Sequence, residues 1–434
     1  MNTKIRLIVM NFLQYAIWGA YLTSMGAFLA QHGLRDNIGI FYSIQGIVSL
    51  FMPALVGIVA DRWIPGQKLL SICHALAGAF MIGAGIYGLN AGEAVQFGPL
   101  FSLYTMAVAF YMPTIALSNS VAYNALEKAG LDTVRDFPPI RVFGTVGFIC
   151  SMWTVDLLGY QNTAMQFVIS GGLGIVLMAY ALTLPECPIN KTATGKSFVE
   201  AMGLQAFSLF KQKKMAIFFI FSMLLGVSLQ ITNGFANPFL QSFGNLKEFA
   251  DTFGVKHANI LISISQISET LCILLIPFML RKFGIKNVML MAMLAWVLRF
   301  GLFGLGNPGS GVWMFVLSCI IYGLAFDFFN ISGSLYVNQE TDVNIRSSAQ
   351  GLFMMMTNGF GATIGTLGAQ AVIDRFVPNI DFKMIPEEQI HDTAMQVWNG
   401  WSTAWYIFAA YALVVAVCFA FAFKYKHTPN TAEK

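Results

Sequence analysis

The chain has 434 residues, of which 56% are hydrophobic and only 11% are charged. Soluble domains carry roughly 25% charged residues, so this composition excludes a soluble protein and indicates an integral membrane protein. The formal net charge of +4 says little as a total, because the distribution of charge among the loops is what matters, and no nucleic-acid partner is expected.

Twelve apolar segments are long enough to cross a bilayer as α-helices, which takes about 20 residues each. They lie near residues 5–30, 38–60, 69–90, 97–121, 138–160, 163–184, 215–240, 257–280, 287–306, 312–337, 346–373 and 399–424. The first segment is too long for a cleaved signal peptide and contains Asn11, Gln14 and Trp18, so we expect it to be the first transmembrane helix. The sequence therefore predicts an all-α integral membrane protein with twelve transmembrane helices.

The distribution of basic residues predicts the orientation of the chain. Most Lys and Arg residues outside the helices fall on the side of the N-terminus, among them Lys4, Lys68, Lys128, Lys191, Lys196, Lys211, Lys282, Lys426 and Lys434. The loops on the opposite side hold only Arg35, Lys247, Lys256, Arg375 and Lys383. By the positive-inside rule, we expect a multi-pass inner (plasma) membrane protein with cytoplasmic N- and C-termini.

The longest polar interruption on the predicted cytoplasmic side divides the chain into two halves. We predict an N-terminal six-helix half at 1–184, a cytoplasmic linker at 185–214 and a C-terminal six-helix half at 215–434. Basic turns at 61–62 and at 281–286 lie about half a chain apart, as expected of a duplicated half. Six plus six helices with this repeated turn resemble the major facilitator superfamily, whose members transport solutes by alternating access.

Several classes of function lack their sequence signature. The six cysteines show no CxxC spacing and are expected to be small buried residues, neither disulfide partners nor metal ligands. Gly195-Lys196-Ser197 lacks the earlier glycine of a P-loop, because Asn190 occupies that position. With no nucleophile–base pair either, we expect no enzyme, no cofactor, no metal and no ATP. A proton gradient is then the expected energy source, and no oligomer is required.

The segment around Asp327 is the most informative one. Asp327 lies in the middle of 312–337 with aromatic residues on both sides, and a carboxylate at that depth costs a few kcal/mol or more. On a helix, three aromatic residues fall on one face and three polar residues on the adjoining face: Tyr322, Phe326 and Phe329 beside Asp327, Asn330 and Ser334. This pattern suits a flat, hydroxylated, neutral molecule and also a proton.

Two neighbouring segments carry further polar faces. In 215–240, Gln230, Asn233 and Asn237 share one face, which serves either interhelical hydrogen bonding or, as we prefer, substrate binding. In 257–280, Gln266 and Glu269 lie one turn apart and point the same way. Glu269 is expected either to accept hydrogen bonds from two vicinal hydroxyls or to form a structural ion pair with an intramembrane cation, Arg299 or Arg141.

Arg141, Thr145 and Phe148 share a face near the start of 138–160. Asp136 is a candidate helix cap before this segment, with proline in the first turn. Arg141 either snorkels toward the cytoplasm or lines a site, and Thr145 and Phe148 either line that site or pack against neighbours. His74 is expected to be a packing residue rather than a proton relay.

Long motifs throughout the chain resemble the bacterial nucleoside:proton symporter family: Met52–Trp63, Asp136–Arg141, Leu229–Asn233, Ser265–Thr270, Phe326–Ser334, Met354–Gly361 and Phe423–His427. The resemblance implies a major facilitator carrier that moves nucleosides inward with protons. It also implies a set of cavity residues, which match Arg141, Thr145, Phe148, Gln230, Asn233, Gln266, Glu269, Tyr322, Phe326 and Asp327. This set agrees with the residue patterns, because a nucleoside has a flat base for aromatic rings and ribose hydroxyls for amides and carboxylates.

We therefore expect a secondary active transporter that imports nucleosides by proton symport through alternating access. Because an apolar environment disfavours the charged form of a carboxyl group, Asp327 is expected to take up the proton. Glu269 shares or replaces this role. Two alternatives use the same fold: a proton-coupled sugar or polyol symporter, and an uncoupled nucleoside facilitator.

Overall fold

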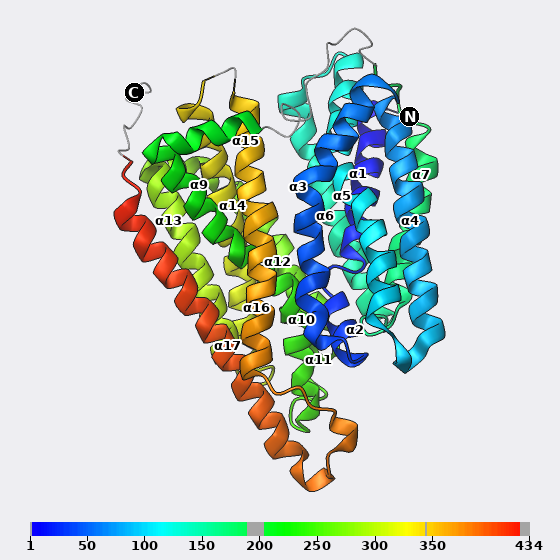
Figure 1. Cartoon of the computed structure of the whole chain (residues 1–434), viewed down its shortest axis with the longest axis vertical. Coiled ribbons are helices and arrows are strands. Elements are labelled where there is room, and N and C mark those ends of the chain that lie inside the picture. Colours follow the sequence, from blue (N-terminus) through cyan, green and yellow to red (C-terminus); the bar gives the residue numbers. More distant parts are fainter. Residues whose placement is uncertain (1, 189–203, 343–344, 426–434) are drawn as a thin grey trace. The chain divides into compact units, whose positions relative to one another are not determined.

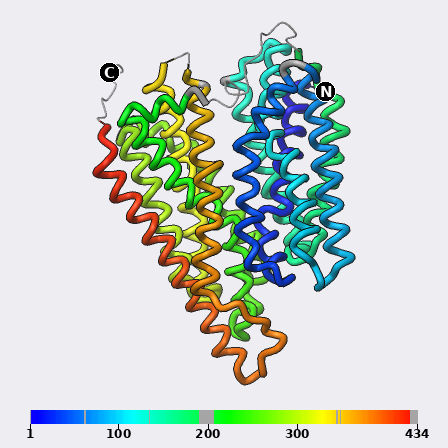
Figure 2. The backbone as a smooth tube through the Cα atoms, in the orientation of Figure 1, coloured from blue at the N-terminus to red at the C-terminus, as the bar shows by residue number. Residues whose placement is uncertain are grey.

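The computed structural model describes residues 2–188, 204–342 and 345–425, and these residues form helices joined by turns and loops (Figure 1). The chain divides into two compact units, Met1–Met202 and Gly203–Lys434, which we call the N-terminal and the C-terminal unit. In Figure 2 the first unit runs from blue to green and the second from green to red. Half of the predicted linker, including Gly195-Lys196-Ser197 and Lys191, lies outside the described residues, as do Lys426 and Lys434.

The N-terminal unit contains six predicted transmembrane segments, the first of them in two pieces. Its α-helices are α1 (Thr3–Gly19), α2 (Met25–Gln31), α3 (Ile38–Arg62), α4 (Gly66–Ala91), α5 (Phe97–Lys128), α6 (Thr133–Leu157) and α7 (Met165–Ala181), with short 3-10 turns η1 (Arg35–Asn37) and η2 (Gly92–Ala94). Helix α1 packs against α6, and α4 packs against both α5 and α7. These contacts bury the apolar core of the unit.

The C-terminal unit begins with the 3-10 segment η3 (Leu204–Lys211). Its helices are α9 (Lys213–Leu229), α10 (Ile231–Ser242), α11 (Phe253–Lys256), α12 (Ala258–Ile273), α13 (Ile276–Leu305), α14 (Val312–Glu340), α15 (Arg346–Met354), α16 (Ala362–Phe376) and α17 (Glu387–Ala422), with η4 (Phe243–Asn245), the π-helical η5 (Met355–Gly361) and η6 (Phe382–Met384). Helix α14 packs against both α12 and α13, and α13 also packs against α17.

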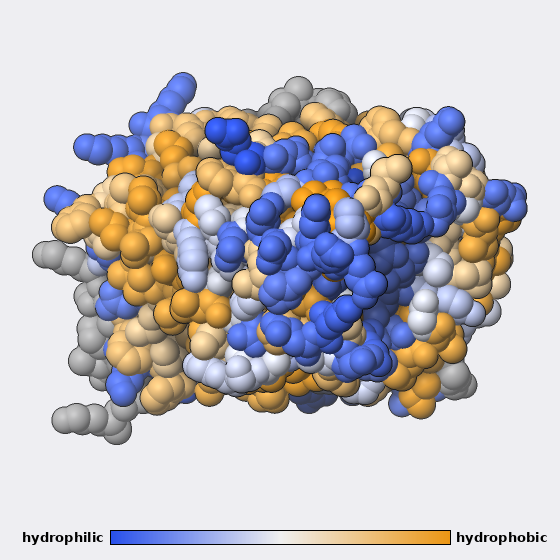
Figure 3. Space-filling view, turned by 90° about the horizontal axis from the view of Figure 1, so that it is seen from below, coloured by the Kyte–Doolittle hydropathy of each residue, from blue (hydrophilic) through white to orange (hydrophobic). Residues whose placement is uncertain are grey.

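Each of the twelve predicted segments falls on helical structure. Within the described residues, eight helical stretches are long and apolar enough to span a membrane, and α7 and α12 are shorter apolar helices. The end face in Figure 3 carries many hydrophilic residues, whereas the edge of the view is largely hydrophobic. This distribution is the one expected when loops meet water and helix faces meet lipid.

Four predicted segments are interrupted in the structure. The first consists of α1 and α2, and the seventh of α9 and α10, which meet at Gln230. The eighth consists of α12 and the start of α13, and the eleventh of α15, η5 and α16. Hydropathy does not reveal such breaks, because apolar residues continue through them. A π-helical stretch inside an α-helix often marks a functional region, and η5 packs directly against α9.

Helix α17 begins at Glu387, whereas the sequence places the last transmembrane helix at 399–424. Pro386 precedes the helix and two glutamates lie in its first turn, an arrangement that favours a helix start. The extension is anchored on its own unit, since the Trp398 ring packs against Phe243 at a centroid distance of 5.3 Å. The predicted start was therefore too late.

The basic turn predicted at 281–286 contains a break between two helical stretches, as expected. It lies within α13, where Gly284 has φ 73° and ψ 165° and breaks the helix. Glycine adopts a positive φ without the steric cost that a side chain would add. Helix therefore extends to about residue 280, as predicted, but in two pieces: α12 ends at Ile273, and the first stretch of α13 runs from Ile276 to the break at Gly284.

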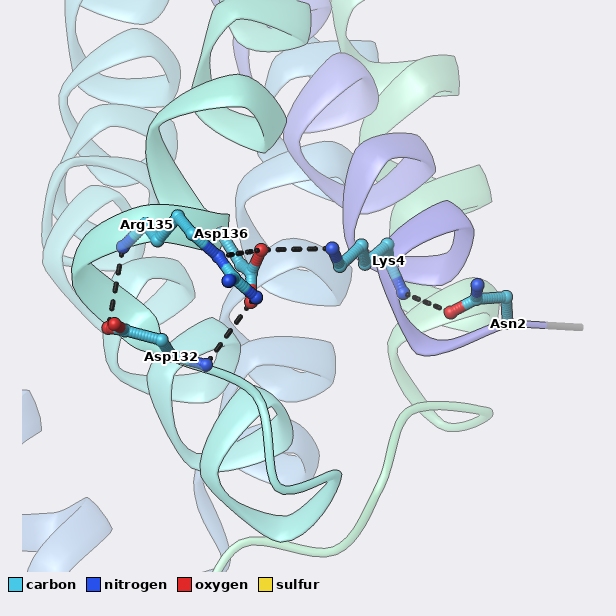
Figure 4. A network of polar contacts seen from close by, with 5 residues as sticks. All are labelled: Asn2, Lys4, Asp132, Arg135 and Asp136. Atoms are coloured by element: carbon cyan, nitrogen blue, oxygen red, sulfur yellow. Dashed lines mark hydrogen bonds and ion pairs between the residues drawn. The ribbon is translucent and has the colours of Figure 1, made fainter.

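Asp136 was predicted as a helix cap, but α6 begins earlier, at Thr133. Its carboxylate accepts hydrogen bonds from Lys4 Nζ at 2.9 Å and from the backbone N–H of Asp132 at 3.2 Å (Figure 4). Arg135 Nε lies 3.3 Å from the same carboxylate. Asp136 therefore ties the start of α6 to α1 instead of capping the helix.

Glycines allow α9 to pack closely against η5. A Cβ atom on Gly226 would collide with the backbone carbonyl oxygen of Thr357, and one on Gly361 would collide with the carbonyl oxygen of Met223. We therefore expect Gly226→Ala to destabilise the folded protein by about 1–3 kcal/mol, because backbone atoms must move to admit the methyl group. The measurement is the midpoint of thermal unfolding of the purified protein in detergent.

The matched control is Gly301→Ala in α13. A Cβ atom there has no neighbouring atom within 4 Å, so alanine should be neutral or slightly stabilising in the helix. Equal unfolding midpoints for the two variants would contradict the assigned packing of α9 on η5.

Candidate functional site

Helices α12 and α14 are in backbone contact where the predicted site residues lie. Ser268 Oγ donates a hydrogen bond to the carbonyl oxygen of Ile320. Gly323 leaves no room for a Cβ atom against the Ser268 carbonyl. Because these contacts lie beside Glu269 and Tyr322 in the chain, they bring the acid–amide face of α12 next to the aromatic face of α14.

Two aromatic rings on α14 form a stacked pair. The rings of Tyr322 and Phe326 lie 5.6 Å apart at an interplanar angle of 13°, with Tyr322 buried and Phe326 partly exposed. Phe329, which the sequence groups with them, is fully buried and packs toward Phe353 of α15 instead. The stack of Tyr322 and Phe326 therefore provides a flat apolar surface, and Phe329 belongs to the core.

Polar groups lie beside this surface. Asp327 is 5% exposed and Gln266 is 8% exposed, whereas Glu269 is partly accessible. In the described part of the chain, no donor reaches the side-chain oxygen Oε1 of Gln266. A buried acceptor of this kind normally has a partner, so the Gln266 amide is suited to accept a hydrogen bond from a bound molecule.

The amides of the seventh segment separate into two groups. Gln230 occupies the junction of α9 and α10, and its Oε1 accepts a hydrogen bond from Asn233 Nδ2 at 2.9 Å. Both side chains are partly accessible. Asn237 is fully buried and donates to Asn259 of α12 at 2.7 Å. Asn237 thus forms a hydrogen bond between two helices, the first of the two roles considered from the sequence. Gln230 and Asn233 form an accessible amide pair.

The predicted residues of the N-terminal unit lie on one face of α6. The guanidinium carbon of Arg141 lies 3.8 Å from the centroid of the Tyr15 ring on α1, so Arg141 is held by an aromatic face. Phe148 packs edge-on against Trp18, with ring centroids 6.2 Å apart at 88°. Arg141 and Phe148 therefore both adjoin aromatic residues of α1, and partly accessible Thr145 lies between them in the chain.

Sequence reasoning missed the residues that hold Trp18 in place. The indole N–H of Trp18 donates to Gln45 Oε1 at 3.1 Å, and Gln45 Nε2 donates to the Tyr104 hydroxyl at 2.9 Å. The signal available was a single amide, Gln45, within the apolar run 38–60. By contrast, His74 is fully buried and bonded to Gln14, as expected of a packing residue.

The side chains of the two units suit a neutral, polar, partly aromatic ligand. The C-terminal unit presents a stacked aromatic pair, accessible amides and two carboxyl groups, and the N-terminal unit presents an arginine among aromatic rings. Ring faces bind flat heterocycles, whereas carboxylates and amides bind hydroxyl groups. A buried carboxyl group can also accept and release a proton.

Comparisons with known proteins agree with this chemistry. Residues 1–428 match the family described as nucleoside H+ symporter. The chain is 46% identical to the xanthosine permease of Escherichia coli (strain K12) over 433 residues, 99% of this chain and 98% of that protein. It is also 46% identical to the nucleoside permease NupG of the same organism over 430 residues, 98% of this chain and 97% of that protein.

A crystal structure of the nucleoside transporter NupG superposes with a TM-score of 0.85 at 45% identity, covering 98% of this chain and 100% of that one. The predicted family is confirmed by these matches, and so is the predicted all-helical membrane transporter fold. This chain belongs to the nucleoside H+ symporter family, as a multi-pass membrane transporter and not an enzyme.

Proposed function

We propose that this protein imports nucleosides together with protons by alternating access, with defined roles for the predicted site residues. Tyr322 and Phe326 hold the base, and Gln266, Glu269 and the amide pair hold the ribose hydroxyls. Asp327 carries the proton, with Glu269 as the second acid. In the N-terminal unit, Arg141, Thr145 and Phe148 are the proposed substrate-binding residues.

The unpartnered oxygen of Gln266 is the observation that carries this proposal. It lies on α12, one turn before Glu269, and α12 packs against the helix that carries the stacked rings. A ribose hydroxyl would satisfy this acceptor while the base lies against the ring faces. The names of the two permeases, for xanthosine and for nucleosides, support a base plus a ribose as the ligand.

The distribution of charge supports a proposal for how the chain is oriented in the membrane and in which membrane it resides. We propose that both termini are cytoplasmic and that the protein resides in the inner membrane, because basic residues concentrate on one side of the predicted helices. On this orientation a proton gradient directed inward drives uptake. The transport cycle then uses no ATP and requires no second copy of the chain.

The proposal predicts that recognition needs both the base and the ribose. Stacking of a base on an aromatic side chain is worth about 1–3 kcal/mol, so free ribose should inhibit uridine uptake only at roughly 10- to 100-fold higher concentration than a nucleoside such as adenosine. Free uracil should be similarly weak, because it lacks the hydroxyls. The measurement is the inhibition constant of each compound against uptake of labelled uridine in cells that express the protein.

A pair of variants tests the ring surface. Phe326→Leu should weaken the binding of uridine, because its base contacts the ring. The weak inhibition by free ribose should stay unchanged, because ribose does not contact the ring. Phe421→Leu is the control, since Phe421 is 79% exposed on α17. If ribose competed as well as adenosine in the unaltered protein, the assigned base contact would be wrong, and a sugar or polyol carrier would be indicated.

A further inference from the structure

A buried cation lies next to the proposed base-binding rings and has no role in the proposal above. Arg299 is in α13 and is 1% exposed. A guanidinium group inside the membrane-spanning region costs several kcal/mol unless its charge is compensated, and such residues usually serve a function. The contacts of Arg299 indicate which function it serves.

Arg299 of α13 connects to α12 and α14, the two helices that carry the proposed acids and rings. Its Nη1 donates to the backbone carbonyl of Ser318 on α14 at 2.8 Å, and the Ser318 hydroxyl donates back to the carbonyl of Arg299 at 2.9 Å. The same Nη1 lies 3.4 Å from the hydroxyl of Ser265 on α12, the residue before Gln266. The guanidinium is thus fixed by Ser265, which precedes Gln266, and by Ser318, one helical turn before Tyr322.

The guanidinium also lies against a ring of the proposed site. Its carbon is 4.6 Å from the centroid of the Tyr322 ring, and that ring stacks on Phe326. Trp296 meets the Tyr322 ring nearly at a right angle, 5.9 Å between centroids. Tyr322 is therefore held by a cation and by the edge-on contact with Trp296, which restricts how the ring can tilt.

Part of the guanidinium lacks a hydrogen bond in the described residues, because its Nε–H has no acceptor. A residue selected only to connect helices would be expected to satisfy its donors, whereas the Arg299 guanidinium leaves Nε–H without an acceptor in the described residues and lies over the Tyr322 ring. The orientation of Tyr322 is the feature of the site that this arrangement determines.

We propose that Arg299 is a positioning residue for nucleoside recognition, which orients the Tyr322 ring so that Tyr322 and Phe326 together bind the base. This inference rests on the proposed function, because it assumes that these rings bind the base. Arg299 does not contact the substrate in this scheme. Its effect on affinity passes through Tyr322.

The test is a double-mutant cycle on uridine affinity, measured as the dissociation constant of the purified protein. Arg299→Met should weaken uridine binding about tenfold, and Tyr322→Leu should weaken it by at least as much. The combined variant should bind no more weakly than Tyr322→Leu alone, because the arginine acts only through that ring. Arg299→Lys, which keeps the charge but not the flat guanidinium, should fall between the unaltered protein and Arg299→Met.

Arg281→Met is the matched control, since Arg281 is an exposed arginine that lies before the break of α13 at Gly284 and should leave affinity unchanged. Unchanged affinity in Arg299→Met, or losses that add in the combined variant, would overturn the proposal. If Arg299→Met does not fold, the same cycle run with Arg299→Lys decides, with thermal unfolding verifying each variant. Failure of the unaltered protein to bind uridine would instead overturn the proposed function itself.

Discussion

Asp327→Asn is expected to abolish accumulation of nucleosides while leaving exchange across the membrane intact. Asparagine resembles the protonated carboxyl group in shape and lacks a charge, so the variant can bind substrate and cycle but cannot release a proton. One proton moving through a potential of 100 mV supplies about 2.3 kcal/mol, which corresponds to about 50-fold accumulation of a co-transported solute. The variant should lose this accumulation, so that uridine only reaches equal concentrations on the two sides of the membrane.

The measurement compares two uptake modes in the same proteoliposomes. Net uptake against a gradient should disappear in Asp327→Asn, and exchange of labelled for unlabelled uridine should persist. Asp251→Asn is the control, because Asp251 lies in a loop of the same unit, 91% exposed and paired with Lys256. Continued accumulation by Asp327→Asn would exclude Asp327 as the proton carrier and leave Glu269 as the candidate.

Glu269→Ala is expected to raise the Michaelis constant for uridine roughly 10- to 100-fold. A hydrogen bond to a charged group contributes about 1.5–3 kcal/mol, and the proposed carboxylate accepts from adjacent ribose hydroxyls. Glu269 is partly accessible on α12, one turn after Gln266, so it is exposed to a ligand and not sealed in the core. The Michaelis constant is measured from initial rates of uridine uptake.

The assigned partner of Glu269 is tested with a substrate that lacks the hydroxyls. In the unaltered protein, 2′,3′-dideoxyuridine should be a much weaker substrate than uridine. In Glu269→Ala this difference should shrink, because only Gln266 and the amide pair then contact the hydroxyls. Glu388→Ala is the control, because Glu388 is exposed in the first turn of α17. If Glu269→Ala still discriminated between the two compounds as strongly as the unaltered protein, another residue would recognise the ribose.

Much of the fold is encoded in local composition and was therefore accessible from the sequence. Each transmembrane segment is an apolar run, so the helices and their approximate positions follow from length and hydropathy alone. The breaks at Gln230, at residues 20–24 and at η5 were not accessible, because they depend on contacts with neighbouring helices. The close approach of Gly226 to Thr357 is one such contact.

The candidate site likewise has features that the sequence predicts and features that depend on tertiary packing. Polar residues in apolar helices, such as Asp327 and Gln266, stand out in the sequence because their burial needs a reason. Which of them line a surface is decided by tertiary packing, and this is why Asn237 and Phe329 were grouped with the site but lie in the core. The supporting roles of Gln45 and Arg299 likewise depend on partners far away in the chain.

Proton coupling is tested most directly with the purified protein in liposomes that carry an imposed pH gradient, acidic outside. Uridine uptake and internal pH are followed together, with and without a protonophore. We expect uridine to accumulate above its external concentration, protons to enter only when uridine is present, and the protonophore to collapse both. Uridine that equilibrates regardless of the gradient, with no uridine-dependent proton entry, would contradict symport and indicate an uncoupled facilitator.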